Sequence, residues 1–379
     1  MAFVLTPEQE SIRDTARRFV HERTPVAHLR HLRDTGDPTG FDREVWSEMA
    51  ALGFAGITLP AEHGGAGLGY AELGLVLEAC GRSLVPSPLV ATVLLGASAV
   101  ALGGTLAHKD EVLPAIAGGE RLLALAHEEG SRHARYRIRT TAARTTDGYR
   151  LSGEKVLVLD GHVADTLVVV ARTSGAAGDR EGITLFLVPA SAPGVSRERT
   201  LLVDSRGAAR VRFDGTAVRC ADVLGEVDHG SDLLDAVLDR ATVGLASEML
   251  GGLAEVFDRT VDYLKVRRQF GVAIGSFQAL KHRAAQMFCE VELTRSVVMD
   301  ALGAVDEARA ELPLRACAAK ARATDAFLLI TAEAVQMHGG VGVTDELDIG
   351  LFLKRARAAE MTFGGAAYHR DRFARLSGY

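Results

Sequence analysis

Apolar residues recur at helical spacing through the first third of the 379-residue chain. Ile12, Ala16 and Phe19 fall on one face of a helix, which indicates that this face is buried. Thr6 precedes a proline and is followed three residues later by a glutamine, the pattern of a capping box at a helix start. Further segments with the same period follow. We therefore predict three or more helices within an N-terminal helical domain, residues 1–119.

The period changes near residue 120, where short alternating or continuously apolar runs replace the helical pattern. Asp147-Gly148 lies between two such runs and is a hairpin turn signal. The glycine-containing segment 174–179 indicates a surface loop between two others. These features predict a small β domain over residues 120–225, with strands at Tyr136–Ala143, Tyr149–Leu159, Thr166–Ala171, Ile183–Val188 and Ala209–Phe213.

Helical periodicity returns after residue 225, in segments much longer than those at the N-terminus. Pro313 and the glycines of 339–342 separate these segments. Long antiparallel helices joined by short loops form four-helix bundles, so residues 226–379 are expected to be a C-terminal bundle. The fold class is mainly α with a central β domain. The bundle helices are predicted at Ser231–Val266, Ser276–Gly303, Leu314–His338 and Leu351–Met361.

Charge and composition exclude several partners. The formal net charge is -6, without the basic excess that a phosphate-backbone binder needs, so nucleic acid is not expected. The N-terminus lacks a secretory signal and the four cysteines show no paired spacing, which together predict a cytoplasmic protein. Residues 83–107 are uncharged over a membrane-span length, yet their prolines and glycines favour a buried helix. His28 and His31 lack further ligands, so no metal site is expected.

Two motifs in the C-terminal third carry candidate chemistry. Arg267 can give fixed cationic donors to a diphosphate, and Gly339 and Gly340 let backbone approach a planar group closely. Taken singly, each motif also fits a helix end that binds no ligand. The motifs are Tyr263-Leu264-Lys265-Val266-Arg267-Arg268-Gln269-Phe270-Gly271, with Gln278 shortly after, and Gln336-Met337-His338-Gly339-Gly340-Val341-Gly342.

Together these motifs resemble the Tyr-x-x-x-Arg-x-Gln-Phe-Gly and Gln-x-x-Gly-Gly-x-Gly signatures of the acyl-CoA dehydrogenase family. Residues 59–67 also resemble the family's N-terminal glycine-rich loop. The resemblance implies an N-terminal helical domain, a middle β-barrel and a C-terminal four-helix bundle, with FAD as the cofactor. In this family both motifs mostly reach the FAD of a neighbouring subunit. The resemblance assigns FAD contacts to Arg267, Gln269, Phe270, Gln278, Gln336, Gly339 and Gly340.

The catalytic base of the family is a carboxylate, which removes the α-proton of an acyl thioester while the β-hydride goes to the flavin. One family position for this base matches Gly364 and the other matches Ala241. Neither position therefore holds a carboxylate. Asp239 is a weak alternative base, although a helix-surface or cofactor-site hydrogen-bond acceptor is the simpler interpretation. Glu248 is interpreted as a solvated helix residue.

The β domain departs from the family as well. Glu128-Glu129-Gly130 stands where the family has Thr-Glu-Pro, and residues 157–161 stand where it has Trp-Ile-Thr-Asn-Gly. Two hydroxyls and an aromatic wall near the flavin ring are thereby lost. His127 forms a polar cluster with Glu128 and Glu129, and the sequence does not indicate its role.

Retention of the FAD motifs with loss of the base predicts the subunit that lacks the catalytic glutamate in a heteromer. The Phe363-Gly364 ending and residues 204–209 resemble the small subunits of two-component pimeloyl-CoA-type and steroid side-chain dehydrogenases. The expected partners are a second acyl-CoA dehydrogenase-like subunit in an α2β2 assembly, an acyl-CoA substrate and an electron-transfer flavoprotein-type acceptor. Three alternatives stay open: a homo-oligomer with a relocated base at Asp239 or Glu248, a flavin-dependent oxygenase, and a scaffold without flavin.

Overall fold

The computed structural model describes residues 4–379. The chain divides into two compact units. The bundle unit comprises the described part of residues 1–31 with 70–85 and 242–379. The sheet unit comprises residues 32–69 and 86–241. Helices α2 (Val26–Thr35) and α7 (Gly230–Val266) each continue from one unit into the other along the chain.

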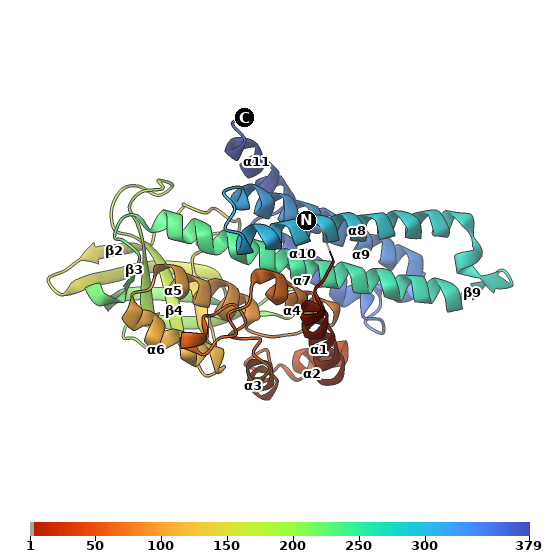
Figure 1. The fold of residues 1–379 in the computed structure, drawn as a ribbon, viewed down its shortest axis with the longest axis horizontal. Coiled ribbons are helices and arrows are strands. Elements are labelled where there is room, and N and C mark those ends of the chain that lie inside the picture. The colour runs from red at the N-terminus through yellow and green to blue at the C-terminus, as the bar shows by residue number, and fades with distance from the viewer. Residues whose placement is uncertain (1–3) are drawn as a thin grey trace. The chain divides into compact units, whose positions relative to one another are not determined.

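Long helices make up most of the bundle unit (Figure 1). Helix α9 packs against α8, α10 and α11, and small buried residues along α9 allow these close approaches. The unit contains α1 (Pro7–Arg23), α4 (Tyr70–Arg82), the later part of α7, α8 (Gln278–Asp306), α9 (Leu312–His338), α10 (Ile349–Met361), α11 (Ala366–Leu376), the short helices η4 (Ile274–Ser276) and η5 (Gly339–Val343), and the strands β9 (Arg268–Gln269) and β10 (Val272–Ala273).

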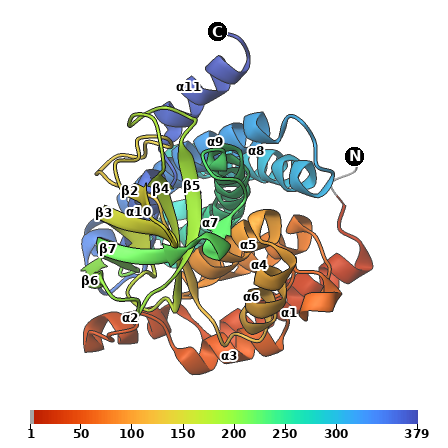
Figure 2. The same cartoon turned by 90° about the vertical axis from the view of Figure 1, so that its left-hand side faces the viewer.

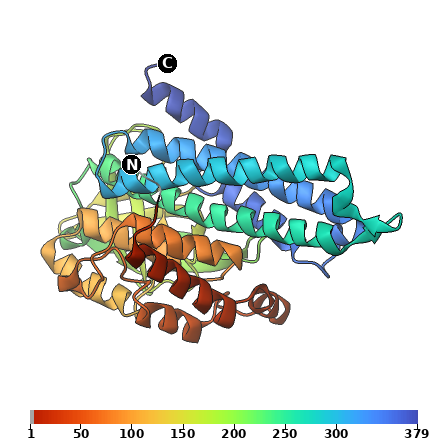
Figure 3. The ribbon, with the colours of Figure 1, turned by 45° about the vertical axis from the view of Figure 1, so that its right-hand side comes forward.

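Helices α4 and α7 cross in direct backbone contact. A Cβ on Gly81 would lie 1.9 Å from the carbonyl oxygen of Glu248, and one on Gly251 would lie 1.9 Å from that of Glu78. Only glycine therefore fits at these two positions. In Figure 3, α7 and α8 run side by side from this region to the β9–β10 hairpin at the end of the bundle.

The sheet unit combines short helices with an eight-stranded sheet (Figure 2). Its helices are α3 (Arg43–Ala51), η1 (Ala61–His63), the π-helix η2 (Leu89–Ala97), α5 (Ser98–Gly103), α6 (Leu106–Ala117) and η3 (Cys220–Asp222). Its strands are β1 (Leu123–Ala126), β2 (Thr141–Arg144), β3 (Gly148–Leu159), β4 (Thr166–Arg172), β5 (Ile183–Pro189), β6 (Val195–Leu201), β7 (Gly207–Arg219) and β8 (Val223–Leu224).

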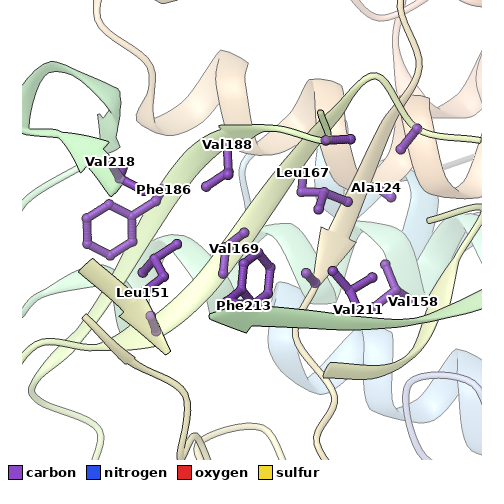
Figure 4. Packing of buried hydrophobic residues seen from close by; sticks show 14 of the residues in the cluster. Ala124, Leu151, Val158, Leu167, Val169, Phe186, Val188, Val211, Phe213 and Val218 are labelled. Carbon is purple, nitrogen blue, oxygen red and sulfur yellow. The ribbon is translucent and has the colours of Figure 1, made fainter. Parts of the chain in front are cut away.

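The strands pair in the order β6-β7-β3-β2-β4-β5-β8, and β1 pairs with β4 in parallel. Among residues 4–379 no ladder joins β6 to β8, so the expected barrel is an open sheet. Apolar side chains of its strands form one core, in which the Tyr149 ring meets Phe186 edge-on at 5.2 Å between centroids. Figure 4 shows Leu151, Val169 and Phe213 in this cluster.

The three-part architecture and most of the expected elements are confirmed. The Thr6 capping box is present, with Oγ1 accepting from Gln9 N at 3.2 Å. The strand expected at Tyr136–Ala143 is wrong over its first half, since only Thr141–Arg144 pairs. There side chains satisfy the backbone groups: Arg172 donates to the carbonyls of residues 136 and 138, and Glu129 accepts from the amides of residues 139 and 140. Helix α11 and strands β1 and β6 were not predicted.

The long uncharged segment near residue 90 is a buried helix, as predicted. Every residue of η2 is buried. In the described chain, Leu312–Val343 is long and apolar enough to cross a membrane by length and composition. Core helices of water-soluble proteins pass the same test, and α9 is packed within the bundle.

Candidate functional site

The two C-terminal motifs meet at one end of the bundle unit. The Tyr263 ring, near the end of α7, stacks on His338 at the end of α9, with 4.3 Å between ring centroids. Its hydroxyl donates to the His338 carbonyl at 3.3 Å. The His338 ring is fixed in turn by a 2.8 Å hydrogen bond from Nδ1 to the Ala334 carbonyl, and burial lowers the pKa of His338.

Beyond Tyr263 the chain turns through the β9–β10 hairpin. Phe270 and Gly271 form its tip, with φ of 52° and 80°. The side chain of Phe270 is 90% exposed and meets Phe277 edge-on at 6.0 Å between centroids. The Arg267 amide continues the α7 ladder to Tyr263 at 2.9 Å. Phe270 and Phe277 thus form a small exposed aromatic pair at the end of the bundle unit.

All seven residues assigned to FAD face outward from the bundle unit. Their side chains or backbones are exposed in this chain: Arg267, Gln269, Phe270, Gln278, Gln336, Gly339 and Gly340. Within residues 4–379, and apart from the adjacent residues of the chain, no atom lies within 4 Å of a Cβ built on Gly339 or Gly340. The end of the bundle therefore offers a guanidinium, amides, an aromatic ring and open backbone to a group bound from outside. These residue types fit the diphosphate and adenosine half of FAD.

The family position for the base at Gly364 is closed by this chain's own residues. Gly364 is buried with φ of 95°, and a Cβ there would lie 2.5 Å from Tyr368 Cδ1. The Lys320 ammonium donates to the Gly364 carbonyl at 2.8 Å, and His369 Nε2 donates to the Phe363 carbonyl at 3.0 Å. Burial lowers the pKa of Lys320 to about 7. The turn is thus fixed from both sides without a carboxylate.

The second base position, Ala241, is buried in α7. The carboxylates considered on the same helix are both held by arginines. Asp239 is 2% exposed and accepts from Arg135 at 2.9 Å, so the helix-surface interpretation is wrong. Glu248 is 4% exposed and accepts from Arg355 at 2.8 Å, so the solvated interpretation is wrong as well. Both arginines come from distant parts of the chain, and no sequence spacing indicates these pairs.

The segments that depart from the family in the sheet unit carry charged groups. Glu129 accepts from the buried Lys155 ammonium at 2.7 Å and from the Thr140 amide at 2.9 Å. Burial lowers the pKa of Lys155 to about 8. Desolvation raises the pKa of Asp160 to about 7, opposed by the nearby Arg206. Polar groups of this chain thus occupy the segments where the family has its ring-contacting hydroxyls.

The fold and the exposed bundle-end motifs define a flavoprotein oxidoreductase. Sequence profiles of the acyl-CoA dehydrogenase N-terminal, middle and C-terminal domains match residues 6–120, 124–216 and 228–377. The chain belongs to the acyl-CoA dehydrogenase family, whose members use FAD to dehydrogenate acyl-CoA thioesters. Its FAD dependence follows from that membership.

Relatives cover nearly the whole chain. Mitochondrial isovaleryl-CoA dehydrogenase of Pongo abelii is 31% identical over 97% of this chain and 88% of its own length. The structure of a variant of the Tcur3481-Tcur3483 steroid ACAD is 32% identical, covering 98% of this chain and 97% of that one, with a TM-score of 0.88. The ChsE4-ChsE5 complex from Mycobacterium tuberculosis is 28% identical, covering all of both chains, with a TM-score of 0.90.

Proposed function

We propose that this chain is the subunit without the catalytic glutamate in a heteromeric acyl-CoA dehydrogenase. A second acyl-CoA dehydrogenase-like subunit supplies the base for α,β-dehydrogenation of an acyl-CoA. This chain contributes the end of its bundle to the FAD site of that subunit. The assembly we propose is α2β2 in the cytoplasm, with an electron-transfer flavoprotein-type acceptor.

The closed turn at Gly364 is the observation that carries the proposal. If the space beside position 364 were open to solvent, a small rearrangement of this chain could place a base there. The Tyr368 ring instead fills the space that a side chain at position 364 would enter. The alternative carboxylates, Asp239 and Glu248, already have their oxygens bound by guanidinium groups. A relocated base within this chain is therefore disfavoured, because both candidates would have to break a buried ion pair first.

The bundle-end residues have a distinct task in this proposal. FAD, when bound, takes up the hydride from the β-carbon of the substrate. Arg267 neutralises diphosphate charge, and the exposed backbone at Gly339 and Gly340 lies against the cofactor. Phe270, 90% exposed in the isolated chain, becomes buried against the neighbouring subunit. The Tyr263–His338 stack holds the two motifs at a fixed separation.

The comparisons support the proposal of a paired assembly. Two of the similar structures are named for two components each, Tcur3481-Tcur3483 and ChsE4-ChsE5. Their identities of 32% and 28% to this chain support the proposal that it too belongs to a two-component assembly. The description of Tcur3481-Tcur3483 as a steroid ACAD applies to that protein.

Cofactor stoichiometry tests the proposal. The chain is purified alone and together with each acyl-CoA dehydrogenase-like protein encoded beside it, and FAD per chain is measured from the flavin spectrum. The proposal expects little FAD on the lone chain and about one FAD for each pair of unlike chains. Full FAD occupancy of the lone chain as a homo-oligomer would contradict it and would favour the relocated-base alternative.

A further inference from the structure

The loop after β1 brings two imidazoles and a carboxylate together in the sheet unit. His127 and Glu128 follow the strand directly, and His133 returns to them five residues later. One ligand atom from each lies within 4.8 Å of the others. The side chains of His127 and His133 are 3% and 2% exposed, and that of Glu128 is 20% exposed. The sequence analysis expected no metal site and did not indicate a role for His127 and Glu128.

The hydrogen bonds of His127 fix which of its nitrogens faces the cluster. Its Nε2 lies 2.8 Å from the Arg135 carbonyl, which can only accept, so Nε2 carries a proton. In the neutral ring the lone pair is then on Nδ1, 3.4 Å from Glu128 Oε1. A lone pair facing a carboxylate oxygen is repulsive unless a proton or a cation lies between them. The backbone bond is also the outer contact that orients most histidine ligands of metals.

We propose that His127 Nδ1, Glu128 Oε1 and His133 Nδ1 bind a divalent first-row transition ion, with Zn²⁺ the best match. Tetrahedral zinc with bonds of about 2.0–2.1 Å places its ligand atoms roughly 3.3 Å apart. The 3.4 Å separation of His127 Nδ1 and Glu128 Oε1 already fits that geometry. The direct hydrogen bond between His133 Nδ1 and Glu128 Oε1 is replaced on binding. The neutral His133 ring changes tautomer, so its proton lies on Nε2 and the Nδ1 lone pair binds the ion.

The surrounding charges leave room for a cation. The Lys155 ammonium binds Glu129 Oε1 at 2.7 Å and the His127 carbonyl at 3.2 Å. The Arg135 guanidinium binds Asp235 and Asp239 at 2.8 and 2.9 Å. Lys155 and Arg135 are thus already matched by carboxylates other than Glu128. A zinc ion would therefore lie next to ion pairs whose own charges cancel. This limits the electrostatic repulsion between the zinc ion and the Lys155 and Arg135 cations.

Glu128, one of the three proposed ligands, also lines a pocket. This pocket of about 210 Å³ is lined by Glu128 and Glu129 together with Arg132, Arg137 and Arg139. Three protein ligands with one position left to water or substrate are typical of reactive zinc sites, whereas structural sites are closed by four. The arginines make an anionic fourth ligand favourable. The site requires no catalytic glutamate and is independent of the proposed heteromeric role.

Metal binding by the purified protein, alone or with its partner subunit, tests this proposal. After treatment with a chelator and its removal, Zn²⁺ is titrated by calorimetry and Co²⁺ by its visible absorption, which reports tetrahedral coordination. We expect about one ion per chain for the wild type. His133→Ala and Glu128→Gln should weaken binding at least tenfold. The exposed His229 provides a control, because His229→Ala should bind as the wild type does.

Three results would overturn the site. The wild type could bind no ion, the two ligand variants could bind as tightly as the wild type, or His229→Ala could abolish binding, which would indicate a surface histidine site. Circular dichroism shows whether the variants fold. Glu128→Gln keeps a hydrogen-bonding partner for His133 and remains informative if His133→Ala does not fold. A Zn²⁺-dependent rise in Tm for the wild type, absent in Glu128→Gln, is the second expected readout.

Discussion

Replacing Gly364 with glutamate restores the family's acid at its usual position, yet we predict that it destabilises the bundle unit and gives no dehydrogenase activity. Two costs follow from the structure. A non-glycine residue at φ of 95° costs roughly 1–3 kcal/mol in backbone strain. A Cβ 2.5 Å from Tyr368 Cδ1 forces that ring to move, which costs roughly another 1–3 kcal/mol.

The sum of about 2–6 kcal/mol is a large share of a typical unfolding free energy of about 5–15 kcal/mol. Urea unfolding of wild type and Gly364→Glu measures it directly. Gly365→Ala is the matched control: its φ is -81° and the nearest atom to an added Cβ, the Glu360 carbonyl oxygen, is 3.7 Å away. This control should change stability by about 0.5 kcal/mol or less.

The double variant Gly364→Glu with Tyr368→Ala separates the two costs. Removing the ring relieves the steric cost and leaves the backbone strain, so the two changes should couple by roughly 1–3 kcal/mol. The reasoning is refuted if Gly364→Glu alone is as stable as the wild type. It is refuted more severely if that variant, loaded with FAD, abstracts the α-proton of an acyl-CoA.

Three further predictions concern other parts of the chain. The pKa of Asp160 is raised from 3.8 to about 7, so its protonated form contributes stability that is present below pH 4 and is lost as pH rises through 7. Asp160→Asn should remove this pH dependence, and its free energy of unfolding at pH 8 should exceed that of the wild type by about 2 kcal/mol. Unfolding at several pH values measures both effects. Arg355→Met leaves Glu248 buried without its ion-pair partner and should lower the free energy of unfolding by roughly 3–5 kcal/mol. Adding Glu248→Gln should recover part of this loss. If the second change gave no recovery in Tm, the importance of the Arg355–Glu248 ion pair would be contradicted. Arg267→Ala should weaken FAD binding by the assembled protein about tenfold, whereas the exposed neighbour variant Arg268→Ala should not.

The fold could be predicted where the signal is local. The Thr6 cap, the hairpin at Asp147-Gly148 and the long bundle helices depend on residues close together in the sequence, and all are present. The strand expected at Tyr136–Ala143 failed over its first half because Arg172 and Glu129, distant in sequence, bind its backbone groups. No periodicity reveals such competition.

For the candidate site as well, local motifs could be predicted from the sequence and tertiary contacts could not. The motif residues around Arg267 and Gly339 were assigned from their resemblance to a family, and the Tyr263–His338 stack explains how the two motifs are held together. The surroundings of Asp239 and Glu248 were misjudged, because burial and arginine partners depend on tertiary packing. Pairings across about a hundred residues have no signature in a single sequence.

Anaerobic reduction of the flavin by acyl-CoA substrates tests the central claim most directly. Bleaching of the FAD absorbance is followed with the lone chain in the presence of added FAD and with the complex of the chain and its partner subunit. A chain without its own base should leave the flavin oxidised when alone, and the complex should bleach with a suitable acyl-CoA. Bleaching of the lone chain at the rate of the complex would show that it carries a complete active site, and the account would be wrong.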